Sequence, residues 1–254
     1  MKHGRPPVVM IHGSHCAPWA LEGFAEKFSR AGYKVDCPAL RFHDMQTAPD
    51  ALGTTSLLDY AADLEDDLKS LGEPAILIGH SLGGLLAQML AARAPVRAVV
   101  LLAPSAPWGV PPSTLQEIAA AQSLLLKVGF WNKVLAPDTG AMERLALNRI
   151  PHAERAALAQ RLGAESGRAT FETLHWGLDM SRASEVDADK VTCPLLLLAG
   201  GEDRVCPPGT VERTAALYRE RATFQKLDGM SHWLIGEPGW EKVADRSLAW
   251  LDSL

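Results

Sequence analysis

Short runs of consecutive apolar residues alternate along this chain with longer stretches in which apolar residues recur every three or four positions. The first pattern is typical of strands buried on both faces, and the second of amphipathic helices. Their alternation predicts an α/β fold with a mainly parallel, doubly wound sheet that is covered by helices on both faces. The predicted strands are Val8–Ile11, Ala75–Ile78, Val99–Leu102, Leu195–Ala199 and Thr223–Leu227.

Two helices have boundaries that the sequence marks. One apolar stripe begins at Leu57 and ends at Leu71, with Ser56 as a candidate N-cap and Gly72 directly after the helix. A second stripe of the same spacing predicts a last helix from about Trp240 to Leu251.

The middle third of the chain has a different pattern. From Pro104 to about Asp189 the apolar spacing is mainly helical and contains no convincing strand. A helical segment between two strand-rich halves is typical of a cap inserted after the middle strands. We therefore expect one domain over residues 1–254, with a core formed by 1–103 and 190–254 and a cap formed by about 104–189.

Composition excludes several classes of protein. The 254 residues include 25 Lys and Arg against 30 Asp and Glu, a net charge of −5, which argues against a nucleic-acid partner. No uncharged apolar run is long enough for a membrane span. The first residues, Met-Lys-His-Gly-Arg-Pro-Pro, lack the apolar core of a signal peptide, so we expect a cytoplasmic protein. The four cysteines form no Cys-x-x-Cys pair, so we expect reduced thiols and no metal site.

A candidate nucleophile lies between a predicted strand and a predicted helix. Residues 75–86 contain the pattern Gly79-x-Ser81-x-Gly83. A strand that turns abruptly into a helix strains the turn residue, and side chains two positions away on either side would collide with it. Glycines at 79 and 83 remove those collisions and leave the Ser81 hydroxyl exposed near the positive end of the helix dipole.

A serine hydroxyl needs a base to become a nucleophile, and the chain has eight histidines. Their positions relative to the predicted strands decide which one is the candidate. His232 lies in a loop between the last strand and the last helix, at the carboxyl edge of the sheet where ligands bind, so it is the predicted base. The other histidines are less suitably placed to act as the base. His3 lies in the N-terminal tail, His80 is beside Ser81, and His12 and His15 follow the first strand. Patterns typical of the surface or the cap contain His43, His152 and His175.

The imidazole in turn needs a carboxylate that fixes its tautomer. Asp203 follows the most apolar strand by a few residues and is the predicted partner. Glu202 is its neighbour and rival, while Asp228 is expected at a strand end, capping it or facing solvent. The chain order Ser81, Asp203, His232 is the order of one hydrolase fold class.

These residues resemble the α/β-hydrolase superfamily across nearly the whole chain. The motifs that carry the resemblance are His12-Gly13-Ser14, Gly79-His80-Ser81-Leu82-Gly83-Gly84, Gly201-Glu202-Asp203 and Gly229-Met230-Ser231-His232. The segment from Ile11 to Trp19 is similar to the start of the methylesterase and hydroxynitrile-lyase branch. The lyases of that branch have a lysine after the catalytic histidine, where this chain has Trp233, so the resemblance favours ester hydrolysis.

The resemblance also implies an oxyanion hole formed by the backbone N–H groups of Ser14 and Leu82, and it gives His12 a structural role. Substrate contacts are expected from large or polar side chains near the pocket: His15, Trp108, Trp131, Trp176 and Trp233.

The function that we expect is a serine hydrolase without a cofactor, acting on a small carboxylic ester with an apolar acyl or alcohol part. A thioesterase, a lactonase, a hydrolase of carbon–carbon bonds and an acyltransferase all use the same triad and stay open. A ligand-binding protein without catalysis on the same fold is the alternative from another class.

Overall fold

The computed structural model describes residues 4–254, and its centre is a sheet in which all neighbouring strands are parallel. The strand order is β2-β1-β3-β4-β7-β8. The strands of this sheet are β1 (Val8–Ile11), β2 (Val35–Asp36), β3 (Ala75–His80), β4 (Val96–Leu102), β7 (Leu195–Gly200) and β8 (Ala222–Leu227). A separate antiparallel pair joins β5 (Val134–Leu135) to β6 (Glu165–Ser166).

Helices occupy most of the connections between strands. The α-helices are α1 (Glu22–Arg30), α2 (Leu57–Ser70), α3 (Leu82–Ala91), α4 (Leu115–Leu125), α5 (Thr139–Leu145), α6 (His152–Ala159), α7 (Gly167–Leu174), α8 (Pro208–Ala216) and α9 (Trp240–Leu251). Short 3₁₀ helices span Pro18–Leu21, Asp50–Thr54, Phe130–Asn132, Trp176–Leu178, Ala188–Lys190 and Arg219–Arg221.

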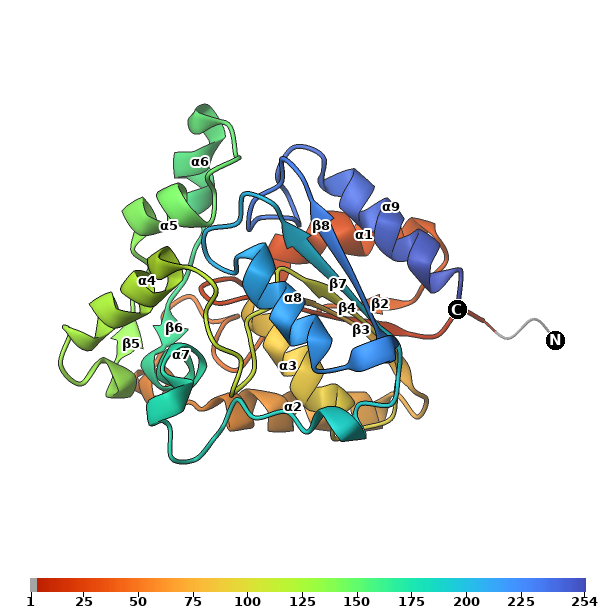
Figure 1. The fold of residues 1–254 in the computed structure, drawn as a ribbon, viewed down its shortest axis with the longest axis horizontal. Helices are drawn as coiled ribbons and strands as arrows, with labels where there is room; N and C mark the ends of the chain where they lie inside the picture. The colour runs from red at the N-terminus through yellow and green to blue at the C-terminus, as the bar shows by residue number, and fades with distance from the viewer. Residues whose placement is uncertain (1–3) are drawn as a thin grey trace.

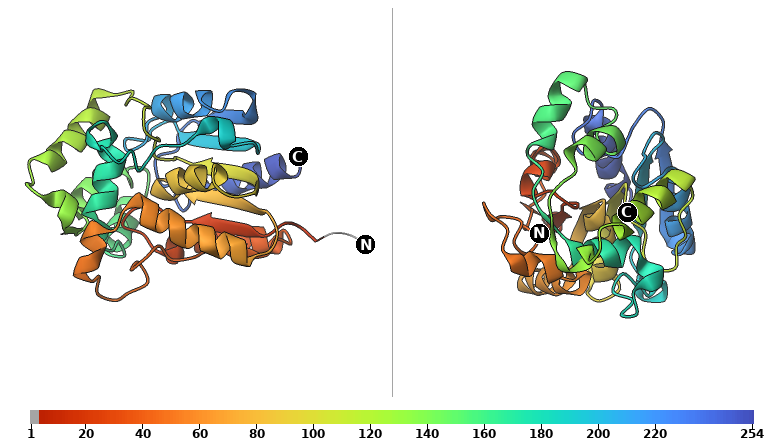
Figure 2. Two further views of the ribbon diagram at one scale, coloured as in Figure 1. Left: turned by 90° about the horizontal axis from the view of Figure 1, so that it is seen from below. Right: turned by 90° about the vertical axis from the view of Figure 1, so that its left-hand side faces the viewer.

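The sheet has helices on both faces, as the alternation of patterns predicts (Figures 1 and 2). Successive side chains of a strand point to opposite faces. In β1, Val9 and Ile11 pack into one apolar cluster with residues of α2, α3 and α8, while Val8 and Met10 pack into another with residues of α1 and α9. Strands buried on both faces explain why their sequences are continuous apolar runs.

The predicted strands are all present: β1 has the predicted bounds, and the other four each differ at one end by one to three residues. The sheet has one further strand, β2, which was not predicted because Val35–Asp36 is too short to give an apolar run. The expectation of no strand between 104 and 189 is wrong, since β5 and β6 lie there. Each has only two residues, so neither produces a detectable period.

Both predicted helices are confirmed, and the first begins as its sequence indicates. The Ser56 hydroxyl accepts a hydrogen bond from the Leu58 N–H at 3.1 Å, and the Asp59 carboxylate accepts from the Ser56 N–H at 2.9 Å. This reciprocal arrangement is a capping box. Gly72, just beyond the helix, has φ +71°, a conformation that favours glycine.

All strands of the main sheet point the same way, so their carboxyl ends meet at one edge. The 104–189 segment, with α4 to α7, lies beyond this edge, and the C-terminus lies toward the other end of the molecule (Figure 1). Loops that leave β3, β7 and β8 therefore run between the sheet and the 104–189 segment. Within residues 4–254, no helix is long and apolar enough to cross a membrane.

Candidate active site

Ser81 is the single residue between β3, which ends at His80, and α3, which begins at Leu82. Its φ of 53° and ψ of −119° are in a region that residues other than glycine rarely occupy. The turn is held from both sides, because the Ser81 N–H donates to the Leu102 carbonyl at 3.1 Å and the Ser81 carbonyl accepts from the Ser105 N–H at 2.9 Å. The strained turn is thus fixed by the neighbouring strand β4 and the residues after it.

The two glycines of the motif are required by contacts closer than any side chain tolerates. A Cβ atom on Gly79 would lie 2.2 Å from the Gly83 carbonyl oxygen, and one on Gly83 would lie 2.1 Å from the Ile11 carbonyl oxygen. The expectation that side chains at 79 and 83 would collide with the turn residue itself is therefore corrected. A side chain at 79 would collide with the start of α3, and one at 83 with the end of β1. Glycine at 83 lets α3 pack directly against β1.

The structure brings Ser81, His232 and Asp203 together from the ends of β3, β8 and β7. The Ser81 Oγ lies 3.0 Å from the His232 Nε2, and the His232 Nδ1 lies 2.9 Å from the Asp203 Oδ2. All three residues are buried. An acceptor carboxylate at Nδ1 places the ring proton there, which leaves the Nε2 lone pair directed at the serine hydroxyl.

Asp203 is held in place by its second carboxylate oxygen. This Oδ1 accepts hydrogen bonds from the N–H groups of Val205 at 2.7 Å and Cys206 at 2.9 Å. Neither rival carboxylate can reach the histidine: the Glu202 side chain is 47% exposed and lies near Arg149, and the Asp228 side chain is 85% exposed.

The loop that carries His232 is fixed by contacts that the sequence analysis did not find. Gly200, at the end of β7, packs directly against this loop, since a Cβ atom at position 200 would be 2.1 Å from the Ser231 carbonyl oxygen. The buried Glu237 carboxylate accepts hydrogen bonds from the Ser231 N–H, at 2.6 Å, and from the Ser231 hydroxyl. Burial raises the pKa of Glu237. No local pattern distinguishes this glutamate from an ordinary loop residue.

The two predicted oxyanion-hole donors belong to segments that adjoin Ser81. A Cβ on Gly13 would be 3.0 Å from the Ser81 Cβ, so the loop after β1 lies directly against the serine. Leu82 is the first residue of α3, where the N–H has no carbonyl one turn earlier to bind. In the part of the chain that the structure describes, neither the Ser14 nor the Leu82 N–H has a hydrogen-bond partner.

Two further histidines near the site are kept in the neutral form by burial. His12 accepts from the Leu40 N–H through Nε2 at 3.1 Å, and its Nδ1 lies 3.0 Å from the Gly13 carbonyl, so it supports the loop. Burial lowers its pKa to about 4. His80 lies with Nε2 2.9 Å from the His232 carbonyl, and burial lowers its pKa to about 3.

Among the remaining histidines, the expectation of a surface or cap role for His43 is wrong. Its side chain is 1% exposed and lies beside Glu165, which comes from β6. The two residues are far apart in sequence, so no local pattern indicates the contact. His175 is buried within the 104–189 segment, His152 is exposed at the start of α6, and His3 lies outside the described residues.

A cavity of about 750 Å³ extends from Ser81 and His232 to the 104–189 segment. Its lining is mainly apolar, and α4 and α5 contribute much of it, among others through Ile118, Leu124 and Met142. Apolar walls around a few polar groups are usual for a small-molecule site. The helices of the 104–189 segment therefore shape the space above the serine.

Three of the predicted substrate-contacting residues line this cavity, namely His15, Trp176 and Trp233. Trp108 and Trp131 do not, which corrects the expectation for both. The Trp108 ring packs edge-on against Trp176 at 5.5 Å, and Trp131 packs against aromatic neighbours within the 104–189 segment. Both indoles pack against other aromatic rings without bordering the cavity, and sequence spacing does not show which side a tryptophan takes.

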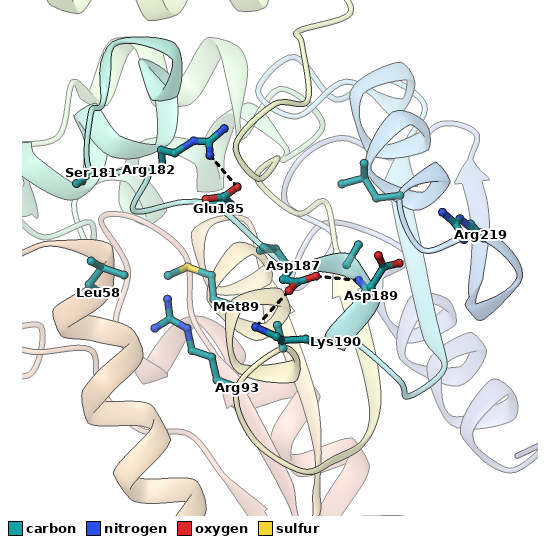
Figure 3. A pocket seen from close by; sticks show the side chains of 14 residues that line it. Leu58, Met89, Arg93, Ser181, Arg182, Glu185, Asp187, Asp189, Lys190 and Arg219 are labelled. Atoms are coloured by element: carbon teal, nitrogen blue, oxygen red, sulfur yellow. Dashed lines mark hydrogen bonds and ion pairs between the residues drawn. The ribbon is translucent and has the colours of Figure 1, made fainter.

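A second hollow of about 800 Å³ lies on the outside, among residues of α2 and α3, the segment 181–190 and the residues that follow α8 (Figure 3). Four of its charged side chains form two ion pairs: Arg182 with Glu185 at 3.3 Å, and Lys190 with Asp187 at 3.2 Å. None of Ser81, His232 and Asp203 borders it.

The chain belongs to the alpha/beta hydrolase family, because the model of that family matches residues 8–246. The resemblance and the fold class expected from the motifs are thereby confirmed.

Two curated relatives and one solved structure extend this result. The chain is 30% identical over 224 residues to a pimeloyl-[acyl-carrier protein] methyl ester esterase of Chromobacterium violaceum, covering 80% of this chain and 78% of the relative. It is 25% identical over 215 residues to a thermostable monoacylglycerol lipase of Bacillus sp., covering 83% and 76%. The structure of a methylesterase from Arabidopsis matches with a TM-score of 0.73 at 14% identity, over 98% of this chain and all of that one, and shows the shared fold.

Proposed function

We propose that this chain is a carboxylic ester hydrolase in which Ser81 forms an acyl-enzyme intermediate. The observation that carries the proposal is the hydrogen-bonded series from Ser81 Oγ through His232 to Asp203 at the floor of an apolar cavity. The two relatives described above, a methyl ester esterase and a monoacylglycerol lipase, also support ester hydrolysis.

In the first half of the reaction, the Ser81 hydroxyl attacks the ester carbonyl carbon while its proton moves to His232 Nε2. The carbonyl oxygen becomes an oxyanion, which the N–H groups of Ser14 and Leu82 bind. The carbon–oxygen bond to the alcohol then breaks, and the imidazolium gives its proton to the departing alcohol. Asp203 keeps the imidazole in the required tautomer and stabilises the imidazolium.

In the second half, His232 removes a proton from water, and the resulting hydroxide attacks the acyl carbon. A second oxyanion forms, bound by the same N–H groups, and collapses, which breaks the bond to Ser81 Oγ. The imidazolium of His232 returns its proton to Ser81 Oγ, and the carboxylic acid is released. Each oxyanion donor of this kind contributes a factor of about 10²–10³ in rate.

The 104–189 segment serves in this proposal as a cap over the acyl site. The side chains of Ile118, Leu124 and Met142 give the cavity an apolar wall. Burying each CH₂ group of a substrate against such a wall contributes about 0.8 kcal/mol. We therefore expect esters with an extended apolar acyl chain to be better substrates than acetates.

The test is hydrolysis of p-nitrophenyl acetate, butyrate and octanoate by the wild type and by Ser81→Ala. The wild type hydrolyses all three, with kcat/KM rising beyond acetate, and the variant loses at least about 10⁴-fold in kcat. Full activity in Ser81→Ala would contradict the proposal. So would a wild type inactive on every chain length, after which thioesters and lactones would be the next substrates to assay. Product analysis with added alcohol separates hydrolysis from acyl transfer.

A further inference from the structure

Glu165 is a fully buried carboxylate outside the proposed triad. It belongs to β6 in the 104–189 segment and has no exposed surface. Burial by itself raises the pKa of such a group, but the hydrogen bond and the charge of His43 outweigh burial and hold the pKa of Glu165 at about 2. A buried charge is retained only where it is well partnered, so its partners indicate its role.

Four donors surround this carboxylate. Glu165 Oε1 accepts from the Tyr60 hydroxyl at 2.9 Å and from the Ser166 N–H at 2.6 Å. Oε2 faces His43 Nε2 at 3.4 Å and accepts from the His15 N–H at 3.3 Å. The donors come from α2, from the loop before α2, from β6 and from the loop after β1. Glu165 thus joins the 104–189 segment to the loop that holds a proposed oxyanion donor.

The geometry around His43 favours its imidazolium form. Its Nδ1 lies 3.0 Å from the Arg41 carbonyl, and its Nε2 lies beside the Glu165 carboxylate. Both partners are acceptors, so both ring nitrogens are donors, which only the protonated ring provides. The positive charge of His43 compensates the negative charge of Glu165, whose Oε2 also accepts from the His15 N–H.

The loop after β1 needs such an anchor because its backbone is strained. A hydrogen bond of 3.2 Å from the Cys16 N–H to the Gly13 carbonyl closes a four-residue turn, in which His15 has φ +60°. A positive φ at the third position of a turn favours glycine and reverses the central peptide relative to the common turn with negative φ. In this turn the reversed peptide is Ser14–His15.

Contacts from the 104–189 segment hold the N–H, the carbonyl and the Nδ1 of His15 in this conformation. Its N–H donates to Glu165, its carbonyl accepts from the Gly163 N–H at 2.8 Å, and its Nδ1 lies 2.8 Å from the Gly163 carbonyl. Gly163 and Glu165 thus bind the strained residue on three sides, next to Ser14.

We propose that Glu165, neutralised by His43, is a positioning residue for the oxyanion hole. Its carboxylate fixes the Ser14–His15 peptide and thereby the neighbouring Ser14 N–H toward Ser81. This inference rests on the proposed function. It makes the 104–189 segment part of the catalytic geometry, in addition to its role in forming the cavity.

Glu165→Gln tests the inference with p-nitrophenyl butyrate as substrate. Because the oxyanion exists only in the tetrahedral intermediates of both half-reactions, kcat falls by about 10–100-fold while KM stays within about twofold. The affinity for a trifluoromethyl ketone, which forms a tetrahedral adduct with an active serine, falls by the same factor as kcat.

Glu172→Gln is the matched control, since Glu172 is also a buried carboxylate of the 104–189 segment. It accepts from the Ser56 hydroxyl at 2.9 Å and the Leu57 N–H at 2.8 Å, and so joins the segment to α2 without contacting the loop after β1. We expect its kcat within about twofold of the wild type. Equal losses of kcat in Glu165→Gln and Glu172→Gln, or a change in KM alone, would overturn the inference.

Should Glu165→Gln not fold, His43→Gln decides instead. It keeps an N–H donor and leaves the Glu165 charge uncompensated, so kcat falls about tenfold at unchanged KM. An unchanged kcat in folded His43→Gln would overturn the inference. Wild-type activity that does not depend on Ser81 would instead contradict the proposed function itself, so the two failures are distinguishable.

Discussion

Asp203 contacts His232 through only one of its two carboxylate oxygens, and the other is bound by the backbone N–H groups of Val205 and Cys206. The carboxylate is therefore oriented by its own turn before it meets the imidazole at 2.9 Å. This division of the two oxygens explains why the proposed triad is already aligned without a substrate.

The first prediction follows from that contact. Asp203→Asn keeps the shape of the side chain but turns a nitrogen donor or a weaker acceptor toward His232 Nδ1, which favours the wrong tautomer. We expect kcat on p-nitrophenyl butyrate to fall about 10³–10⁴-fold with the melting temperature little changed. The control is Glu202→Gln, an exposed neighbour, for which activity stays near the wild-type value. Equal activity in the two variants would rule out the role given to Asp203.

A second prediction concerns the close approach of α3 to β1. Gly83→Ala places a methyl group 2.1 Å from the Ile11 carbonyl oxygen, so one of the two elements has to move. We expect the free energy of unfolding in urea to drop by about 3 kcal/mol or more.

Gly177→Ala is the control for that substitution, because a Cβ there meets nothing within 4 Å. Its free energy of unfolding should stay within about 0.5 kcal/mol of the wild type. Similar stability of the two alanine variants would show that the packing of α3 on β1 tolerates a side chain.

The third prediction uses the ion pair of Glu165 and His43, which also faces Tyr60, His15 and His12. The pKa of Glu165 is lowered from an ordinary 4.5 to about 2, so its stabilisation is complete above 4.5 and is lost as pH falls toward 2. The pKa of His43 is raised from 6.5, so its stabilisation is complete below 6.5 and is lost as pH rises through the raised value.

The stability advantage of the wild type over Glu165→Gln is therefore greatest between about pH 4.5 and 6.5. Urea unfolding of both proteins at a series of pH values measures it. An advantage that does not shrink as the pH falls below 4.5 would be inconsistent with a charged Glu165.

A fourth prediction tests the acyl site. Ala121 of α4 lines the cavity, so Ala121→Phe fills part of it. The ratio of kcat/KM for octanoate to that for acetate should fall at least about tenfold, since long acyl chains lose their space. Ala119→Phe places the same ring at an exposed position on the same helix and should leave the ratio unchanged. A ratio that changes equally in both would place the acyl chain elsewhere.

The sequence was sufficient for the parts of the molecule that depend on local patterns. Continuous apolar runs identify strands buried on both faces, and Gly79-x-Ser81-x-Gly83 identifies the turn between β3 and α3 because contacts there admit only glycine. His232 and Asp203 could be selected because the carboxyl ends of parallel strands meet at one edge.

Contacts between distant segments were not predictable in this way. Glu165 and His43 meet only because the 104–189 segment folds back onto the loop before α2. The sequence also does not show which face a helix of that segment presents to the cavity. Trp176 lines the cavity, whereas Trp108 packs against the Trp176 ring and does not border the cavity.

The central claim is that Ser81 is the nucleophile, and covalent labelling with a fluorophosphonate tests it most directly. A serine activated by His232 attacks phosphorus, and fluoride leaves. The account predicts one phosphonyl group per chain, located on the peptide that contains Ser81, with esterase activity lost in proportion to labelling and no labelling of Ser81→Ala. Labelling of another residue, or full activity in the labelled protein, would contradict it.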